Sequence, residues 1–518
     1  MEIDHRNTTY EVKSIAVHLA LLRTGKVLLF SGDHEHIWNW TKGESSLWDP
    51  KDPHNPINPD LGRNLFCSGH CFLPDGRLFV AGGQSTYNNI ATIILSLPGL
   101  LQLALKIIKK PAADHDIHTF DPNPEIHPNQ RWQRYKPGMP KARWYPTCVT
   151  LPDGKAMIVS GTYSHAHHAL FGFMNLDYEI FDSVTNILST PVKFIDKIKM
   201  YPFLQVLPGG SLFVHSEDTT HIWNIAEKKF ISNVEFKTET PGTRTYPGMG
   251  SCVLLPLEHE ADTAKILLVG GSTTLHPGNN TPATNQSEIF EFNSDMPNES
   301  KKWRKTEHMS ERARFLCDSI LLPDGTILVT NGAAKGTADD NQIAIREVEL
   351  FDPRDETWKD VSYLKRDRLY HGSAVLLPSG EVVVAGSTGH NWVRSVFSPK
   401  KNFEHYIEVI TPPKLQCITT RPEIYDEELS SMKYDKNYKI STDDASSIQK
   451  VSLIKVSSTT HNNNMDQRCL MLPIVNQTAN SLTVSSPKDN TYATPGYYML
   501  FILDENDVPS IGKFVKVG

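Results

Sequence analysis

The sequence predicts an all-β protein, a seven-bladed β-propeller followed by a β-sandwich domain, and two observations carry this prediction. A turn-and-strand motif recurs along most of the chain, and a strand-rich region without the motif follows it. The length of 518 residues exceeds one ordinary hydrophobic core, so the chain needs several domains or a repeat array. The 31 glycines and 34 prolines, many at turn positions, favour short strands over long helices.

The recurring motif consists of a tight turn, an alternating β-branched strand and, in most copies, a closing glycine. Seven copies are present: "LLRTGKVLLFSG" (21–32), "FLPDGRLFVAGG" (72–83), "TLPDGKAMIVSG" (150–161), "VLPGGSLFVHS" (206–216), "AKILLVGG" (264–271), "LLPDGTILVTNG" (321–332) and "LLPSGEVVVAG" (376–386). One interval is longer than the others and contains an apolar insert. The spacing is close to the period of about 50 residues that is typical of kelch repeats.

A second strand element follows most copies of the motif. It reads "IHTFDP", "YEIFDS", "THIWNI", "SEIFEF", "VELFDP" and "RSVFSP" in successive repeats. Two hairpins per repeat make a four-stranded sheet, and seven such sheets around one axis leave few exposed edges. The repeats therefore predict a kelch-type propeller over residues 1–405.

The repeat ends near residue 405, and a second domain is expected over residues 406–518. This region begins with "EHYIEVITPPKL" and ends with "ATPGYYMLFILDENDVPS". Short strands separated by turn residues over this length are typical of an immunoglobulin-like β-sandwich.

The apolar insert occupies about residues 88–112 and includes "IATIILSLPGLLQLALKIIKK" from Ile90 to Lys110. Its length could span a bilayer, but Pro98 and Gly99 interrupt it, and its polar residues fall at helical spacing. Two short amphipathic helices packed on the protein are the favoured interpretation. A contact with a membrane surface or a partner through Ile90–Lys110 is the alternative.

Composition limits the classes of function. The net charge of −7 argues against a nucleic-acid partner, because there is no basic block to displace counterions from phosphates. The seven cysteines are scattered and odd in number, so they do not form a disulfide scaffold. The chain as given begins without a signal peptide, which fits a cytoplasmic protein or a trimmed chain. The sequence does not indicate the oligomeric state.

Three stretches just before blade strands contain more functional side chains than a turn requires. They are "NLFCSGHC" (64–71), "KARWYPTC" (141–148) and "RDRLYHGS" (366–373). Their equivalent positions in three repeats should bring Cys67, Tyr145, Tyr370 and His371 to one end of the channel. Imidazole with phenolate suits Cu(II), although tyrosines in propeller loops more often serve packing. These residues alone leave both interpretations open.

Together with His461 in "TTHNNNMDQR", these residues resemble the copper-radical oxidases, the family of galactose oxidase and glyoxal oxidase. The resemblance covers nearly the whole chain and is greater to the glyoxal oxidase branch. It implies a thioether between Cys67 and Tyr145 as the seat of a radical. It also implies one copper ion with Tyr145, Tyr370, His371 and His461 as ligands, the last on a loop of the second domain that enters the propeller.

The resemblance implies an enzyme that oxidises small aldehydes or primary alcohols with O2 and releases hydrogen peroxide. Tyr370 would be the general base, an aldehyde or its hydrate is the preferred substrate, and location outside the cytoplasm is expected. The alternative is a catalytically silent propeller that binds a protein or glycan partner, since a fold does not guarantee a function. A binding module would have no reason to keep all five residues together.

The match departs from galactose oxidase at one position. In that enzyme a tryptophan stacks over the cross-linked tyrosine, whereas the corresponding stretch here is "VSGTYSHAHHALF". We expect Tyr163, or an aromatic side chain of another loop such as Trp38, Trp40 or Trp144, to take its place.

Overall fold

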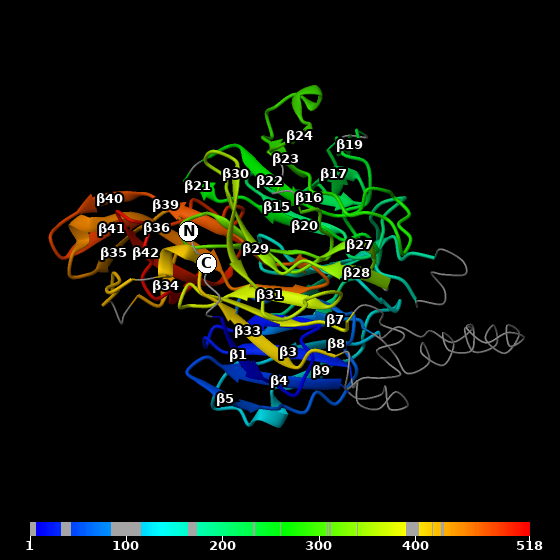
Figure 1. Ribbon diagram of the computed structural model, residues 1–518, viewed down its shortest axis with the longest axis horizontal. Helices are drawn as coiled ribbons and strands as arrows, with labels where there is room; N and C mark the ends of the chain where they lie inside the picture. Colours follow the sequence, from blue (N-terminus) through cyan, green and yellow to red (C-terminus); the bar gives the residue numbers. More distant parts are fainter. Residues whose placement is uncertain are drawn as a thin grey trace, which may run out of the picture.

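The computed structural model describes residues 7–32, 43–83, 115–163, 173–231, 234–259, 261–307, 309, 312–338, 340–389, 403–416, 418–425 and 429–518. The apolar insert, Trp38, Trp40 and the "RSVFSP" segment (394–399) lie outside these residues. The described chain is almost entirely β-structure (Figure 1). Its helices are 3-10 turns, namely η1 (Pro128–Gln130), η2 (Asn298–Ser300), η3 (Pro413–Leu415) and η4 (Ala445–Ser447). Among the helices described, none has the length and apolar character needed to cross a membrane.

Seven sheets of the described chain form the blades of a propeller. The innermost strands contact each other in most pairs of successive blades, and β31 contacts β2, so the last blade lies against the first. Blades I to III consist of β2 (His18–Leu21), β3 (Val27–Gly32), β4 (Gly43–Asp49), β5 (Asp52–Ile57); β6 (Gly69–Phe72), β7 (Leu78–Ala81), β8 (Ile117–Phe120), β9 (Trp132–Tyr135); and β10 (Thr147–Thr150), β11 (Ala156–Val159), β12 (Asp177–Asp182), β13 (Ile187–Leu188), β14 (Val192–Lys193).

Blades IV to VII complete the ring, and the predicted all-β propeller is confirmed. They consist of β15 (Phe203–Leu207), β16 (Ser211–Ser216), β17 (Thr219–Asn224), β18 (Lys229–Phe230), β19 (Phe236–Lys237); β20 (Ser251–Leu254), β22 (Ala264–Val269), β23 (Ser287–Phe292), β24 (Trp303–Lys305); β25 (Asp318–Leu321), β26 (Ile327–Thr330), β29 (Glu347–Asp352), β30 (Thr357–Tyr363); and β31 (Gly372–Leu376), β32 (Val382–Gly386), β33 (Tyr406–Ile410), β1 (Thr8–Glu11). A separate hairpin, β27 (Ala333–Thr337) with β28 (Asp340–Ala344), follows β26 in the chain and is bridged to the segment around Pro282 and Ala283.

Blade VII differs from the sequence-based expectation. Its third strand is β33, which pairs with β32 and receives the N-terminal strand β1 at its outer edge. The segment "EHYIEVI", which we assigned to the second domain, therefore belongs to the propeller. The pattern was ambiguous because this strand does not follow the turn motif directly, as the third strand does in the other repeats. Blade VII therefore joins strands from the beginning and the end of the propeller chain in one sheet.

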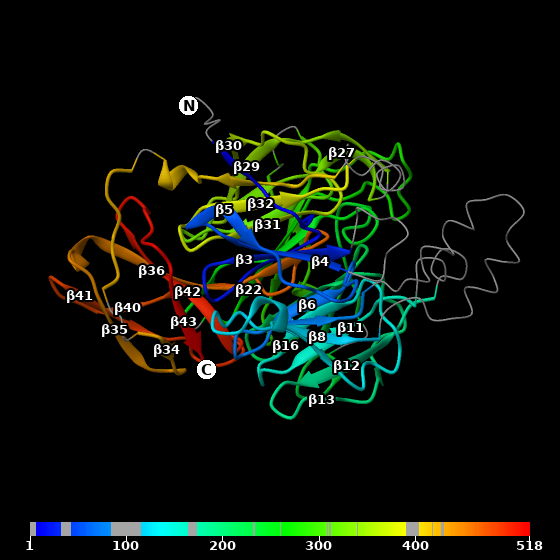
Figure 2. The same ribbon diagram turned by 90° about the horizontal axis from the view of Figure 1, so that it is seen from below.

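The second domain consists of two sheets, as expected for a β-sandwich, and lies beside the propeller in orange and red (Figures 1 and 2). Buried side chains of both sheets form one core between them. The larger sheet has the order β21 (Leu257–Glu258), β39 (Cys469–Leu472), β36 (Ile448–Lys455), β42 (Gly496–Asp504), β43 (Lys513–Val517), β34 (Ser431–Met432), and the smaller β35 (Asn437–Ser441), β41 (Ser481–Ser485), β40 (Ile474–Gln477). The propeller contributes β21, which joins the domains by parallel pairing with β39.

A hairpin of the second domain enters the propeller. Its strands are β37 (Ser458–Thr460) and β38 (Asn463–Asn464), and β37 pairs with β2, so the hairpin extends the inner edge of blade I. The whole stretch from Thr459 to Arg468 is buried. A polar loop can be buried here because the inner blade edges offer backbone hydrogen-bonding groups that need partners.

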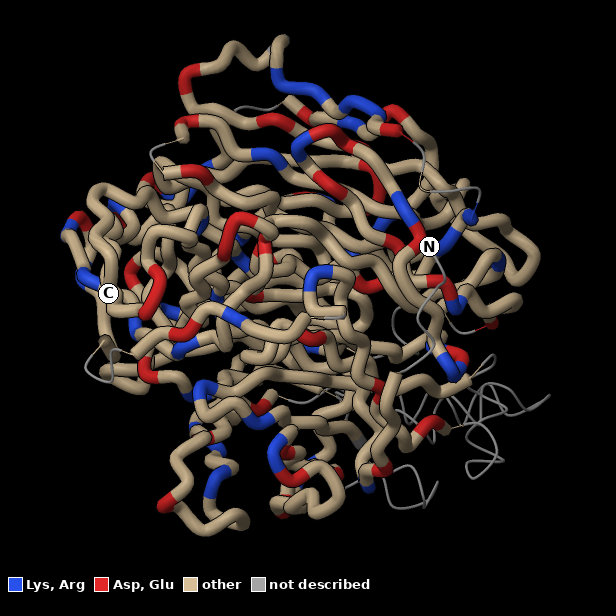
Figure 3. The backbone as a smooth tube through the Cα atoms, turned by 60° about the vertical axis from the view of Figure 1, so that its left-hand side comes forward, with Lys and Arg blue, Asp and Glu red and all other residues tan. Residues whose placement is uncertain are grey.

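Charged residues of both signs are interspersed over the chain in the view of Figure 3. The large apolar side chains lie between the blades and in the sandwich core. Four buried arginine–glutamate pairs are among the charged groups inside the propeller, and they help to build the site.

Candidate functional site

The residues before the innermost blade strands share an unusual backbone conformation. Cys67, Tyr145, Tyr201, Leu316 and His371 have φ values of 62°, 63°, 48°, 60° and 65°. Residues with a Cβ rarely adopt positive φ, and such strain persists only where the surroundings over-determine it. Three of these five residues are candidates from the sequence, so the blade architecture gives them equivalent geometry.

Backbone hydrogen bonds connect these strained residues from blade to blade. The amide of Tyr145 donates to the carbonyl of Cys67 at 3.0 Å, and the amide of Tyr201 donates to the carbonyl of Tyr145 at 3.0 Å. The side chains of Cys67 and Tyr145 are therefore presented by adjacent, directly bonded segments of blades II and III.

Buried ion pairs fix four of the loops that precede innermost blade strands, including those of Tyr145 and His371. In four blades an arginine of the loop pairs with a glutamate of the third strand, and all eight side chains are almost fully buried. Arg143 also donates to the carbonyl of Ser160, and Arg368 to that of Gly386, so each arginine joins three segments of its blade. The pairs are Arg143–Glu179, Arg244–Glu288, Arg314–Glu349 and Arg368–Glu408.

The hairpin that carries His461 is held by its own polar side chains. Gln467 donates to the carbonyl of Ser319 at 2.9 Å and accepts from the amide of Leu321 at 2.8 Å, at the inner edge of blade VI. Asp466 accepts from the amide of Phe72 at 2.6 Å, in blade II. These side chains occupy the positions that a neighbouring strand would fill, and they fix the hairpin in the channel.

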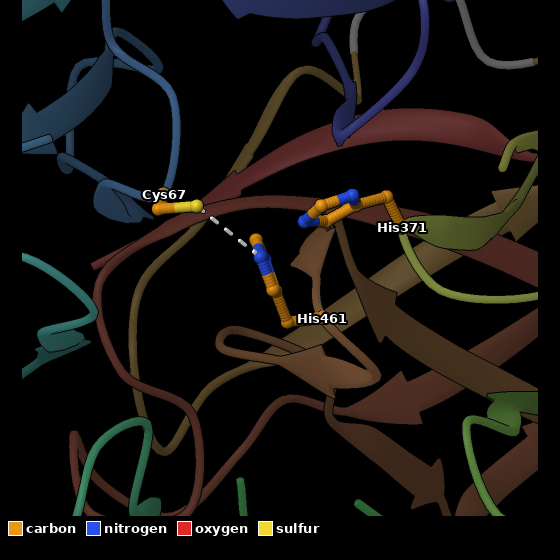
Figure 4. Close-up of side chains that lie close together, drawn as sticks. All are labelled: Cys67, His371 and His461. Atoms are coloured by element: carbon orange, nitrogen blue, oxygen red, sulfur yellow. Dashed lines mark hydrogen bonds between the residues drawn. The ribbon is translucent and has the colours of Figure 1, made fainter. Parts of the chain in front are cut away.

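The five residues expected from the sequence meet in one buried place. Sγ of Cys67 lies 3.5 Å from Nε2 of His461, and the ligand atoms of Cys67, His371 and His461 all lie within 4.8 Å of one another (Figure 4). The hydroxyls of Tyr145 and Tyr370 form a direct, short hydrogen bond. Blades II, III and VII and the second domain supply these five residues, which come from four separate stretches of the sequence.

The rings are packed against each other around His461. Its ring lies edge-to-face with those of Tyr145 and His371, with centroids 4.8 and 4.6 Å apart. Tyr370 stacks on His371 at 3.8 Å and 28°. This packing restricts the rotation of each ring and directs the polar atoms towards a common point.

Threonine hydroxyls orient both histidines. Nδ1 of His371 lies 2.9 Å from Oγ1 of Thr388, and Nδ1 of His461 lies 2.6 Å from Oγ1 of Thr460. Thr460 in turn donates to the carbonyl of Val17 at 2.8 Å. Each histidine would therefore bind a metal through Nε2, because Nδ1 is engaged. Burial, together with neighbouring histidines, lowers the pKa of His461 well below its ordinary value of 6.5, which favours the neutral ligand form.

The rings that lie directly against Tyr145 include those of Trp144, Tyr201 and Tyr246. Trp144 has its ring centroid 4.1 Å away at 40°, and Tyr246 lies 5.1 Å away at 31°. Tyr163 is partly buried against the same apolar cluster. Trp144 was among the expected candidates for the stacking position. Tyr246 was missed because its "TRTYPG" loop matches no motif of the family. The spacing from arginine to tyrosine, which is the same as in "KARWYP", is the signal that could have found it.

The donor set fits a copper ion. Two imidazoles and two phenols converge beside a thiol, and nitrogen and oxygen donors in this combination suit Cu(II). Hydroxyl partners on the far nitrogens of both histidines are typical of metal ligands. Within the part of the chain that the structure describes, Cys67, His371 and His461 form the group of histidine, cysteine and acidic residues that could hold a metal.

Comparison with known proteins agrees with this picture. The family model described as "Glyoxal oxidase N-terminus" matches residues 111–409, more than half of the chain. The chain belongs to the glyoxal oxidase family. A second model, "Galactose oxidase-like, Early set domain", matches residues 421–517.

Several curated proteins are similar to this member of the glyoxal oxidase family. It is 29% identical over 484 residues to a WSC domain-containing protein of Arthroderma benhamiae. This match covers 88% of this chain and 46% of that protein. It is 27% identical over 414 residues to an aldehyde oxidase of Arabidopsis thaliana (74% and 65%) and 24% identical over 512 residues to a galactose oxidase of Gibberella zeae (95% and 67%). The chain thus spans about half to two thirds of the length of these relatives.

A solved structure shares the whole fold. A fungal alcohol oxidase in complex with copper superposes with a TM-score of 0.77 at 21% identity, over 98% of each chain. The arrangement of a propeller followed by a sandwich domain is therefore common to both proteins.

Proposed function

We propose that this chain is a copper-radical oxidase that oxidises small aldehydes or primary alcohols with O2 and releases hydrogen peroxide. The observation that carries the proposal is the meeting of Cys67, Tyr145, Tyr370, His371 and His461 in one buried place. Two relatives, an aldehyde oxidase and a galactose oxidase, support the same class of reaction.

Tyr145, Tyr370, His371 and His461 would hold one copper ion. When bound, copper would supply one oxidising equivalent and the positive charge that favours ionised phenols. The boundary between the propeller and the sandwich domain would lie after β33, between residues 410 and 421. The propeller would contribute three of the ligands and the sandwich domain His461.

Cys67 and Tyr145 would form the second redox unit. The S–H bond of Cys67 and one ring C–H bond of Tyr145 break, a C–S bond forms, and two electrons and two protons pass to O2 to give hydrogen peroxide. The hydrogen bond from the Tyr145 amide to the Cys67 carbonyl holds the two residues side by side for this step. Trp144 and Tyr246 then shield the cross-linked ring from solvent.

Substrate oxidation divides between two tyrosines. Tyr370 would take the proton of the substrate hydroxyl as general base, and the oxidised Tyr145–Cys67 unit would take a hydrogen atom from the adjacent carbon. The remaining electron corresponds to the oxidising equivalent that bound copper would supply. The overall reaction converts RCH2OH and O2 into RCHO and hydrogen peroxide, and an aldehyde hydrate into a carboxylic acid in the same way. We favour aldehydes or their hydrates; a much higher kcat/KM for hexoses with a free primary alcohol would argue against that preference.

Intact mass after exposure to Cu(II) and air, measured under strong thiol reduction, tests the function. A persistent loss of two hydrogens that is absent from Cys67→Ser is the expected result, because a reductant reverses a disulfide but not a thioether. Peroxide release with a panel of aldehydes and alcohols then identifies the substrate. An unchanged mass in copper-loaded protein would contradict the oxidase and favour the alternative, a silent propeller that binds a protein or glycan.

A further inference from the structure

Two further histidines form a buried hydrogen-bonded pair beside the site. His18 lies in β2 of blade I, fully buried and stacked on Phe30 with centroids 4.5 Å apart. Nε2 of His18 is 3.1 Å from the backbone nitrogen of Cys67, and Nδ1 of His18 is 3.2 Å from Nε2 of His70. Nδ1 of His70 is 2.9 Å from Oγ of Ser458.

The direction of these hydrogen bonds follows from one group that cannot change its role. The amide of Cys67 can only donate, so Nε2 of His18 accepts and Nδ1 of His18 carries the proton. That proton is donated to Nε2 of His70, which leaves the proton of His70 on Nδ1, facing Ser458. Burial lowers the pKa of His70 to about 3, so this histidine is neutral at physiological pH, as the chain of hydrogen bonds requires.

The hydrogen-bond chain connects the two parts of the site that come from different domains. At one end is the loop of Cys67, a residue with positive φ, whose amide donates to Nε2 of His18. At the other end is Ser458, the first residue of the strand that leads to His461. We propose that His18 and His70 are positioning residues that align Cys67 with the His461 hairpin for cross-link formation. This inference rests on the proposed oxidase function.

The chain contains a matched control for the loss of a buried histidine. His215 is also fully buried, in β16, the second strand of blade IV, between Phe203 and Phe213, and its Nδ1 lies 2.7 Å from Oγ1 of Thr220. Its Nε2 bonds the carbonyl of Glu217 rather than any residue of the site. Replacing it should therefore perturb packing without affecting Cys67.

The first experiment is an NMR measurement on copper-free protein with 15N-labelled histidine. Single substitutions assign the imidazole signals to His18 and His70. His18 and His70 should both appear as the neutral tautomer protonated on Nδ1. A His18 ring protonated on Nε2 would overturn the inference, whether or not the protein binds copper.

The second experiment follows the loss of two hydrogens over time after addition of Cu(II) and air. His18→Leu should cross-link about tenfold more slowly or worse, because a small displacement of a reacting group has a large effect on rate. His18→Gln should retain most of the rate, since its side-chain oxygen can accept from the Cys67 amide, and His215→Leu should match the unsubstituted protein. Ser458→Ala removes only the hydroxyl that ends the series of hydrogen bonds from Cys67, and it should also slow cross-linking.

The outcomes separate this inference from the function it rests on. Normal cross-linking in both His18→Leu and Ser458→Ala would overturn the positioning role and leave the oxidase intact. A lack of cross-linking in the unsubstituted protein would overturn the oxidase function and the positioning role together, while the tautomers would still report whether the hydrogen-bond chain exists.

Discussion

Nε2 of His461 lies 3.5 Å from Sγ of Cys67, although the two residues are 394 positions apart in the chain. They meet because β37 extends the inner edge of blade I and the hairpin behind it fills the channel. The site is therefore completed by a second domain rather than by the propeller alone, and its properties depend on how firmly that hairpin is held.

Removing the imidazole of His461 should abolish copper binding without unfolding the chain. We expect His461→Ala to lose more affinity than the roughly 100-fold that outer-shell changes cost, together with all peroxide production. Competition titration measures the copper affinity, and circular dichroism checks that the chain remains folded. His405→Ala, which alters a histidine bonded to the carbonyl of Lys13, should bind copper normally. Retained activity in His461→Ala would show that the ligand assignment is wrong.

The threonines behind the histidines should tune metal affinity. Thr388→Val and Thr460→Val preserve shape but remove the hydroxyl that orients each imidazole, and each should weaken copper binding by about 10- to 100-fold. The matched control is Thr220→Val, which removes an equivalent hydroxyl from His215. Equal copper affinity in all three variants would mean that packing alone sets the ring orientation.

The repeated ion pairs allow structural and functional effects to be separated. Glu179→Gln and Glu349→Gln each leave a buried arginine without its counter-charge, so each should cost about 3 to 5 kcal/mol in the free energy of unfolding. Cross-linking should slow in Glu179→Gln alone, because Arg143 precedes Tyr145 in the loop whereas Arg314 precedes Leu316. Denaturant titration and the mass assay measure the two effects, and equal cross-linking rates in both variants would contradict the link.

Asp318 should make stability depend on pH. It accepts hydrogen bonds from Asn331, Asn462 and Thr459, but burial dominates and raises its pKa from an ordinary value of 3.8 to about 7. Between these values the unfolded state has released the proton and the folded state has kept it, so stability falls as pH rises through the window. The full shift corresponds to about 4 kcal/mol.

The Asp318→Asn variant tests this expectation by difference. The stability of the unsubstituted protein relative to the variant should decline between about pH 4 and pH 7, as measured by denaturant unfolding. Asp52→Asn, at an exposed position, should show no such trend. A flat difference for Asp318→Asn would mean that the hydrogen bonds offset the burial of the carboxylate.

Most of the propeller could be predicted from the sequence, because each blade repeats a turn, an alternating strand and a second strand. The limit of that reasoning is blade VII. There the strand that contains Glu408 was assigned to the second domain. The segment "RSVFSP", which lies outside the described residues, was expected to be the corresponding strand of this blade. Glu408 pairs with Arg368 as Glu179 pairs with Arg143, so the repeated glutamate was a signal that could have placed the strand correctly.

The five candidate residues were found by their resemblance to a known family, but their surroundings were not. His18 sits in an ordinary alternating strand and Thr388 in a segment without a motif, whereas Thr460 precedes His461 in a quoted stretch that gives no sign of its hydroxyl contact. The roles of these residues therefore follow only from three-dimensional contacts. The positive φ of Tyr145 and His371 was also hidden, because sequence patterns associate that conformation with glycine.

The hairpin in the channel also sets an order in time. Residue 461 leaves the ribosome after every blade has been synthesised, so a growing propeller holds Cys67, Tyr145 and His371 without the last histidine. The pairing of β37 with β2 then joins a late segment to one of the earliest strands. Completion of the site is thereby delayed until the scaffold around it exists, and oxidative chemistry would begin only in a finished molecule.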